Sequence, residues 1–122
     1  MTVPHAEGMD VAGLDDEGSS EVLDGVRLAQ LAAGDRMSVQ HFDIEPGAGV
    51  DDHSHEHEQA GFLFEGAILF VVDGEEYQVE AGDSYVIPGE AVHSATSNGD
   101  EPAVGVELFS PPRPNPPWAA EE

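Results

Sequence analysis

The segment from Gly47 to Gly66 reads GAGVDDHSHEHEQAGFLFEG, and a second segment, GDSYVIPGEAVH, runs from Gly82 to His93. His53 and His55 are two residues apart, so on a β-strand both side chains point to the same face. Gln59 follows four residues later, and His93 comes from a separate strand pattern. Three imidazoles and one amide oxygen make a four-ligand set for a divalent transition metal, with positions left open for water or substrate.

Composition excludes several classes of protein. A chain of 122 residues is expected to form one domain, large enough to bury a core. It has no cysteine, which excludes disulfides, iron–sulfur clusters and thiol nucleophiles. No apolar run approaches the ~20 residues of a membrane span, and the N-terminus does not resemble a signal peptide. We therefore expect a soluble, cytoplasmic protein.

The charge is strongly negative. The chain has 26 acidic residues against three arginines and no lysine, which gives a formal net charge of −23. Nucleic acids and anionic membranes need cationic patches, so neither is an expected partner. Such charge can indicate disorder, but 39% hydrophobic residues in strand patterns oppose that interpretation. We expect a folded domain with an acidic surface suited to high salt, from a halophilic source. The alternative is an acidic protein that binds metals or basic partners nonspecifically.

Short strand patterns separated by turn signals fill the middle of the chain. The expected strands are residues 36–44, two runs within 61–72, and residues 75–79, 84–87 and 103–109. Asp73–Gly74 predicts a hairpin turn, whereas residues 21–32 fit a strand pair or a helix equally well. This spacing predicts a sandwich or barrel. Residues 1–20 are expected to be acidic and flexible or loosely docked, 21–113 to form the domain, and 114–122 to be a proline-rich acidic tail.

The two histidine segments resemble the two sequence motifs of the cupin family. The first motif is matched in register by five residues: Gly47, His53, His55, Gln59 and Gly66. Glutamine stands where the family usually has glutamate. The second motif is matched by Gly82, Pro88 and His93. Here Glu90 replaces a glycine, and Ser97 stands where an asparagine is common.

The cupin resemblance implies an all-β jelly-roll barrel (a double-stranded β-helix) that binds one divalent transition metal: Ni, Zn, Mn or Fe. The implied ligands are His53, His55, Gln59 and His93. A register that starts from His55 and His57 puts Gly61 or Phe62 at the third ligand position, and neither can coordinate. His57 is therefore the extra histidine, expected in the substrate pocket. Cupins of this size commonly form homodimers, so a homodimer is expected.

Two further stretches resemble the KdgF-type cupins, which convert 4,5-unsaturated monouronates to linear keto-uronates. Residues 107–113, ELFSPPR, resemble that family's D-x-F-S-P-P-R stretch, and residues 53–59, HSHEHEQ, resemble its HSHxHEQ. The resemblance implies that Glu107 is the catalytic acid/base, where the family has aspartate. It also implies that Phe109 lines the substrate pocket and that Arg113 binds the substrate.

The chemistry of the ligand set agrees with this function but leaves alternatives. Neutral ligands leave a metal its full charge, which favours Lewis-acid catalysis. A uronate is a small acidic sugar that this chain would repel, so a guanidinium such as Arg113 is a natural anchor. The alternatives are a metal-dependent dioxygenase and a non-catalytic sugar- or metal-binding protein, because cupin folds host many functions.

Overall fold

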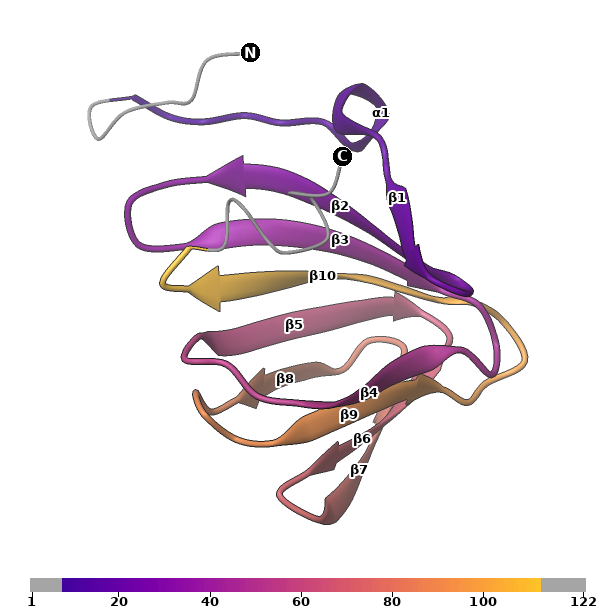
Figure 1. Ribbon diagram of the computed structural model, residues 1–122. Helices are drawn as coiled ribbons and strands as arrows, with labels where there is room; N and C mark the ends of the chain where they lie inside the picture. The colour runs from indigo at the N-terminus through magenta and orange to yellow at the C-terminus, as the bar shows by residue number, and fades with distance from the viewer. Residues whose placement is uncertain (1–7, 113–122) are drawn as a thin grey trace.

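A computed structural model describes residues 8–112 of the chain, and nearly all of its regular structure is β-strand (Figure 1). In chain order the elements are α1 (Leu14–Glu17), β1 (Ser20–Leu23), β2 (Val26–Ala33), β3 (Ser38–Ile44), β4 (Gly49–His53), β5 (Glu58–Glu65), β6 (Ala67–Val72), β7 (Glu75–Glu80), β8 (Ser84–Ile87), β9 (His93–Ser97) and β10 (Ala103–Ser110). Among the described residues, no helix is long and apolar enough to cross a membrane.

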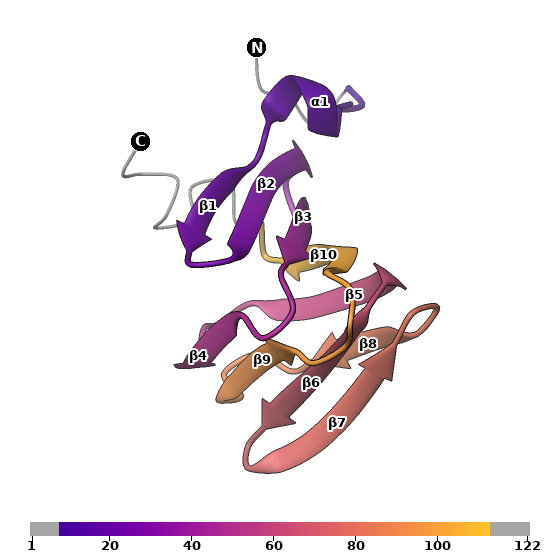
Figure 2. The same ribbon diagram turned by 90° about the vertical axis from the view of Figure 1, so that its right-hand side faces the viewer.

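The strands form two antiparallel sheets that pack face to face (Figure 2). The six-stranded sheet has the order β1-β2-β3-β10-β5-β8, and the four-stranded sheet has the order β4-β9-β6-β7. This confirms the all-β jelly-roll expectation. Within residues 8–112 the sheets do not join into one closed barrel, because no strand of one sheet is hydrogen-bonded along its length to the other.

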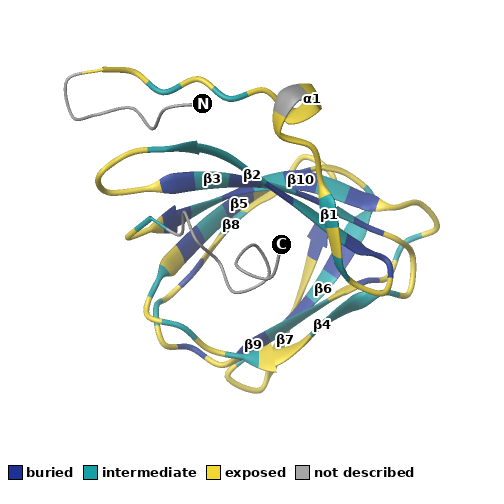
Figure 3. Cartoon of the chain, turned by 45° about the horizontal axis from the view of Figure 1, so that its top comes forward, coloured by how far each residue is buried: buried dark blue, intermediate teal, exposed yellow. Residues whose placement is uncertain are grey.

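Burial alternates along several of the strands, as one inward face and one outward face require (Figure 3). In β3 and in β10, every second residue is buried. The two sheets contribute these inward side chains to a common core, which contains Val26, Phe42, Ile44, Leu63, Ile68, Phe70, Val79 and Ile87. The core therefore lies between the sheets and supports the strands that carry the candidate site.

The turns follow the sequence signals. Asp73 and Gly74 both have positive φ, 49° and 86°, as the tight turn of the β6–β7 hairpin requires. Gly66, at φ 81°, separates β5 from β6, and a Cβ there would collide with the backbone of Pro102. Residues 21–32 belong to the strand pair β1 and β2 rather than to a helix. Hydrogen bonds between β2 and β3 in the six-stranded sheet stabilise this extended conformation.

The segment before β1 lies against β2. The carboxylate of Asp10 accepts a hydrogen bond from the backbone N–H of Ala33 at 2.9 Å, and α1 contacts β2. The predicted C-terminal tail, residues 114–122, lies outside the described residues.

Strand register places four residues in one row across the inner face of the six-stranded sheet. Gln40 of β3 pairs with Glu107 of β10, Glu107 pairs with Gly61 of β5, and Gly61 pairs with Tyr85 of β8. Residues directly opposite each other in a sheet share a face. The row is therefore polar except for its glycine, and it faces the candidate site.

Candidate metal centre

Three histidines converge between the ends of β4 and β9. The ring nitrogens that His53, His55 and His93 offer as ligands lie within 4.8 Å of one another. His53 ends β4 and pairs directly with His93, which begins β9. The expectation that His53 and His55 share a strand is wrong, because β4 ends at His53 and His55 lies in the connection to β5. That connection brings the His55 ring to 5.2 Å from the His93 ring, between centroids.

Each of these rings is oriented by a backbone carbonyl. The Nδ1 atom lies 2.9 Å from the Asp51 oxygen in His53, 3.2 Å from the His57 oxygen in His55, and 3.0 Å from the Ala91 oxygen in His93. A carbonyl oxygen only accepts, so Nδ1 carries the proton and donates in each case. Nε2 is then the basic nitrogen of all three rings, the tautomer suited to binding a metal.

Gln59 adds an amide from the opposite sheet. It is buried on β5, and its Nε2 donates to Glu107 Oε2 at 2.7 Å. This bond fixes which end of the amide faces Glu107. The other end, Oε1, is buried and accepts no hydrogen bond from residues 8–112. Burying a hydrogen-bond acceptor without a partner costs free energy. A divalent ion would remove that cost, so this oxygen is suited to be its fourth ligand.

Glu107 lies at the centre of a buried hydrogen-bond network. Besides Gln59, it accepts from the Tyr85 hydroxyl at 2.8 Å and more weakly from Gln40 Nε2 at 3.4 Å. Burial raises the pKa of Tyr85 above its ordinary value of 10.0, and the negative charge of Glu107 and the hydrogen bond to it act in the same direction. The phenol therefore stays a neutral donor.

A cavity of about 330 Å³ opens beside these groups. Its lining combines His53, Gln59, His93, Glu107 and Phe109 with apolar core side chains. His57 is not among the described residues that line it, although its ring contacts those of His55 and Phe109, with centroids 5.2 and 6.0 Å away. The prediction for Arg113 lies outside the described residues.

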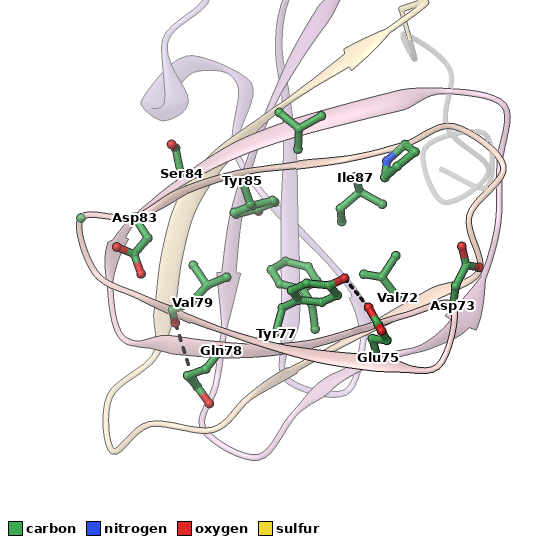
Figure 4. A pocket seen from close by; sticks show the side chains of 14 residues that line it. Val72, Asp73, Glu75, Tyr77, Gln78, Val79, Asp83, Ser84, Tyr85 and Ile87 are labelled. Carbon is green, nitrogen blue, oxygen red and sulfur yellow. Dashed lines mark hydrogen bonds between the residues drawn. The ribbon is translucent and has the colours of Figure 1, made fainter.

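A larger cavity, about 920 Å³, lies between the edge strands β7 and β8 (Figure 4). None of the predicted site residues is among the described residues that line it. Tyr85 forms part of its wall, and Phe70 lines both cavities. The Phe70 and Tyr85 rings pack with centroids 4.7 Å apart, and Tyr85 is not among the described residues that line the smaller cavity.

The comparison with protein families agrees with the two motifs. Residues 40–109 match the family model described as Cupin domain, which covers more than half of the chain. The chain belongs to the cupin family. The matched residues include the four predicted ligands: His53, His55, Gln59 and His93.

Two relatives of this cupin carry the name KdgF. The pectin degradation protein KdgF of Dickeya dadantii (strain 3937) is 28% identical over 102 residues, which cover 82% of this chain and 92% of the relative. The structure of KdgF from Halomonas sp. matches with a TM-score of 0.76 and 25% identity, covering 84% of this cupin and 94% of that chain. These matches confirm the resemblance to KdgF-type cupins.

A third match concerns the fold alone. An RmlC-like cupin from Shewanella frigidimarina NCIMB 400 matches with a TM-score of 0.71 at 22% identity, covering 93% of each chain. The same two-sheet architecture therefore occurs at lower sequence identity.

Sequence reasoning missed three residues that lie in the same row as Glu107: Gln40, Gly61 and Tyr85. A signal was present for two of them. Alternation along residues 36–44 puts Gln40 on the same face as Phe42 and Ile44, and a polar residue at an inward position requires a partner. Alternation in residues 84–87 likewise puts Tyr85 on one face with Ile87. Gly61 gave no signal, because its role depends on the ring of Tyr85 across the sheet.

Proposed function

We propose that this cupin binds one divalent transition metal through His53, His55, Gln59 and His93 and converts a 4,5-unsaturated uronate to its linear keto form. The observation that carries the proposal is the buried Glu107 carboxylate, hydrogen-bonded to Gln59 beside the three histidines. This contact supports Glu107 as the proton-transfer group, because Gln59 is one of the proposed ligands. The similarity to a pectin degradation protein supports an acidic sugar as the substrate.

The proposed reaction is an isomerisation. The C1 hydroxyl of the cyclic sugar loses its proton and becomes an aldehyde as the bond between C1 and the ring oxygen breaks. The enol oxygen released on C5 becomes a ketone as C4 takes up a proton. One proton is lost and one is gained, so no oxidant or reductant is needed, and a single carboxylate can carry out both transfers.

Each protein group then has a distinct part. A bound metal would supply Lewis-acid polarisation of the substrate oxygens, and the four neutral ligands leave its charge intact. Glu107 would accept and return the proton, within reach of the cavity that it lines. Phe109, buried on the same strand, would shape the apolar wall against the sugar ring. We propose Arg113 as the anchor of the substrate carboxylate, on the sequence resemblance.

Loss of ultraviolet absorbance tests the reaction, because the unsaturated uronate absorbs through its conjugated enol ether and the linear ketone does not. The metal-loaded protein should accelerate this loss without consuming oxygen. Glu107→Gln should slow turnover roughly 10²–10⁴-fold while metal content stays unchanged. Glu65→Gln is a matched control, since Glu65 is an exposed glutamate on β5. Arg113→Ala should mainly raise KM.

Two results would contradict the proposal: a rate no higher than that of a metal-stripped control, or a Glu107→Gln variant as active as the parent. An oxygen-electrode trace then separates the remaining functions. Oxygen uptake with an enol or diol substrate would indicate a dioxygenase. Saturable sugar binding without turnover would indicate a binding protein.

A further inference from the structure

We propose that Tyr85 is a positioning residue for Glu107, and that Gly61 is a glycine because the Tyr85 ring must pass over it. The inference rests on the proposed function, since it assigns the orientation in which Glu107 exchanges its proton. Its basis is the row of residues that register places across β10, β5 and β8.

Tyr85 reaches Glu107 across an intervening strand. Gly61 pairs with Glu107 on one side and with Tyr85 on the other, so the two side chains share a face of the sheet. Their strands lie two spacings apart, roughly 10 Å. The phenol spans this gap and donates to Glu107 Oε2 at 2.8 Å. The contact is therefore a property of strand register and does not depend on a loop.

Gly61 makes this reach possible by leaving space. A Cβ at residue 61 would collide with the Tyr85 ring, its nearest neighbours being the Cζ and hydroxyl oxygen of that residue. The φ angle of Gly61 does not lie in the left-handed region, so backbone conformation does not require glycine here. Glycine is required at this position because the phenol of Tyr85 occupies the space that a Cβ would take.

Two short hydrogen bonds fix the carboxylate. Both Tyr85 and Gln59 donate to the same oxygen, Oε2, at 2.8 and 2.7 Å. Donors from two different strands define the plane of the carboxylate as well as its place. Removing the Tyr85 hydroxyl takes away one of these two donors, so we expect the carboxylate to be held less firmly in its orientation. A proton-transfer group must be held within about 10–20° of its productive geometry, so rotation lowers kcat.

The ring and the hydroxyl of Tyr85 have separable roles. The ring packs on Phe70 and forms part of the wall of the larger cavity, which is a structural role that phenylalanine preserves. The hydroxyl contacts Glu107 and is the group that the inference concerns. Tyr85→Phe therefore removes the positioning contact and keeps the wall.

The chain offers a matched control for this variant. Tyr77 also donates its phenol to a glutamate, Glu75, at 2.8 Å, but both residues are exposed and line the larger cavity (Figure 4). We expect Tyr85→Phe to lower kcat by about 10–100-fold, the usual cost of losing a group that orients a reactive one. KM and metal content should match the parent protein, and Tyr77→Phe should match it in all three measurements. An unchanged kcat in Tyr85→Phe would overturn the inference.

A double variant separates positioning from general destabilisation. If Tyr85 acts through Glu107, then adding Tyr85→Phe to Glu107→Gln should slow kcat no further. An equal loss in both backgrounds would overturn the inference. Gly61→Ala, which displaces the ring by its Cβ, should lower kcat in the same direction with metal retained.

A crystal structure of Tyr85→Phe keeps this test independent of the proposed function. A parent protein inactive on unsaturated uronates would contradict the proposed function. The crystal structure would still show whether the Glu107 carboxylate depends on Tyr85. We expect the carboxylate to be rotated or in two orientations, with the introduced phenyl ring in the place of the phenol ring. A carboxylate unmoved relative to the parent protein would overturn the inference.

Discussion

At the scale of single residues, backbone carbonyl oxygens orient the three histidines that are proposed as metal ligands. The rings of His53, His55 and His93 each donate Nδ1–H to a carbonyl oxygen. Holding the tautomer in this way removes the cost of selecting it when a metal binds. The ligand assignment can therefore be tested by metal content alone.

His55→Ala should reduce bound metal from about one ion per chain to a small fraction, because the three ligands that remain bind the ion weakly. Elemental analysis of protein loaded and then desalted measures this. His41→Ala is the control, since His41 lies on β3 away from the cluster. Full metal content in a His53→Ala/His93→Ala double variant would show that the assignment is wrong.

Tyr85 is expected to make the free energy of unfolding fall as the pH rises in the alkaline range. Its pKa is raised in the folded state, so below pH 10.0 both states hold the proton and its contribution is fully present. Above that pH the unfolded chain releases the proton while the folded one keeps it. The free energy of unfolding should then fall by up to about 1.4 kcal/mol per pH unit.

Denaturant titrations between about pH 8 and about pH 11 would measure this decline. This range begins about two units below the ordinary pKa of tyrosine and ends about one unit above it. Tyr85→Phe should show a shallower decline than the parent protein. Parallel curves for the two proteins would contradict the assignment of the alkaline loss to Tyr85.

The spacing of the histidines predicted which residues converge, but not how Glu107 is held. The ligand types and their intervals are local features of the sequence, whereas the contact between Tyr85 and Glu107 joins residues that are 22 positions apart on non-adjacent strands. It arises only once β5 is placed between β8 and β10. No local pattern encodes that placement.

At the scale of elements, β5 shows how alternation divides one strand between core and surface. Leu63 is fully buried and Phe64, the next residue, is half exposed. Leu63→Ala should lower the free energy of unfolding by about 2–5 kcal/mol, through lost burial and the cavity left behind. Phe64→Ala, although it removes a larger side chain, should cost less than about 1 kcal/mol. Urea unfolding of both variants measures this, and equal losses would contradict the inward assignment.

Strands with clear turn signals were predicted from the sequence, and the exceptions have physical reasons. The expected strands at 75–79, 84–87 and 103–109 are confirmed as β7, β8 and β10. The sequence of residues 21–32 fits a strand pair or a helix equally well. The extended conformation is favoured only by the hydrogen bonds that β2 makes to β3, which lies further along the chain. His55 was placed on a strand by its spacing from His53, but β4 ends first and the chain turns toward β5.

At the scale of the whole molecule, negative charge is nearly uncompensated. Among residues 8–112 the one ion pair is Arg27–Glu45, 3.1 Å long and exposed to solvent. With a net charge of −23, repulsion between carboxylates acts against the folded state. At about 0.01 M salt this repulsion extends over ~30 Å, and at about 1 M over only ~3 Å.

The melting temperature should therefore rise steeply between these two salt concentrations. Differential scanning calorimetry in sodium chloride measures the rise, and a parallel series in sucrose controls for solute exclusion at the surface. A melting temperature independent of salt would contradict the halophilic interpretation. That interpretation stays a prediction, as do the homodimer and the cytoplasmic location.

The proposed ligands belong to different sheets: His53 and His93 to the four-stranded sheet, and Gln59 to the six-stranded one. An ion held by all of them would fasten the two layers to each other, so metal binding and folding would be coupled. At a free metal concentration about 100 times the Kd, folding would gain about 2.7 kcal/mol. A chelator should lower the melting temperature of the parent protein and leave that of His55→Ala unchanged. Metal affinity could then be ranked across candidate ions from melting curves, without any substrate.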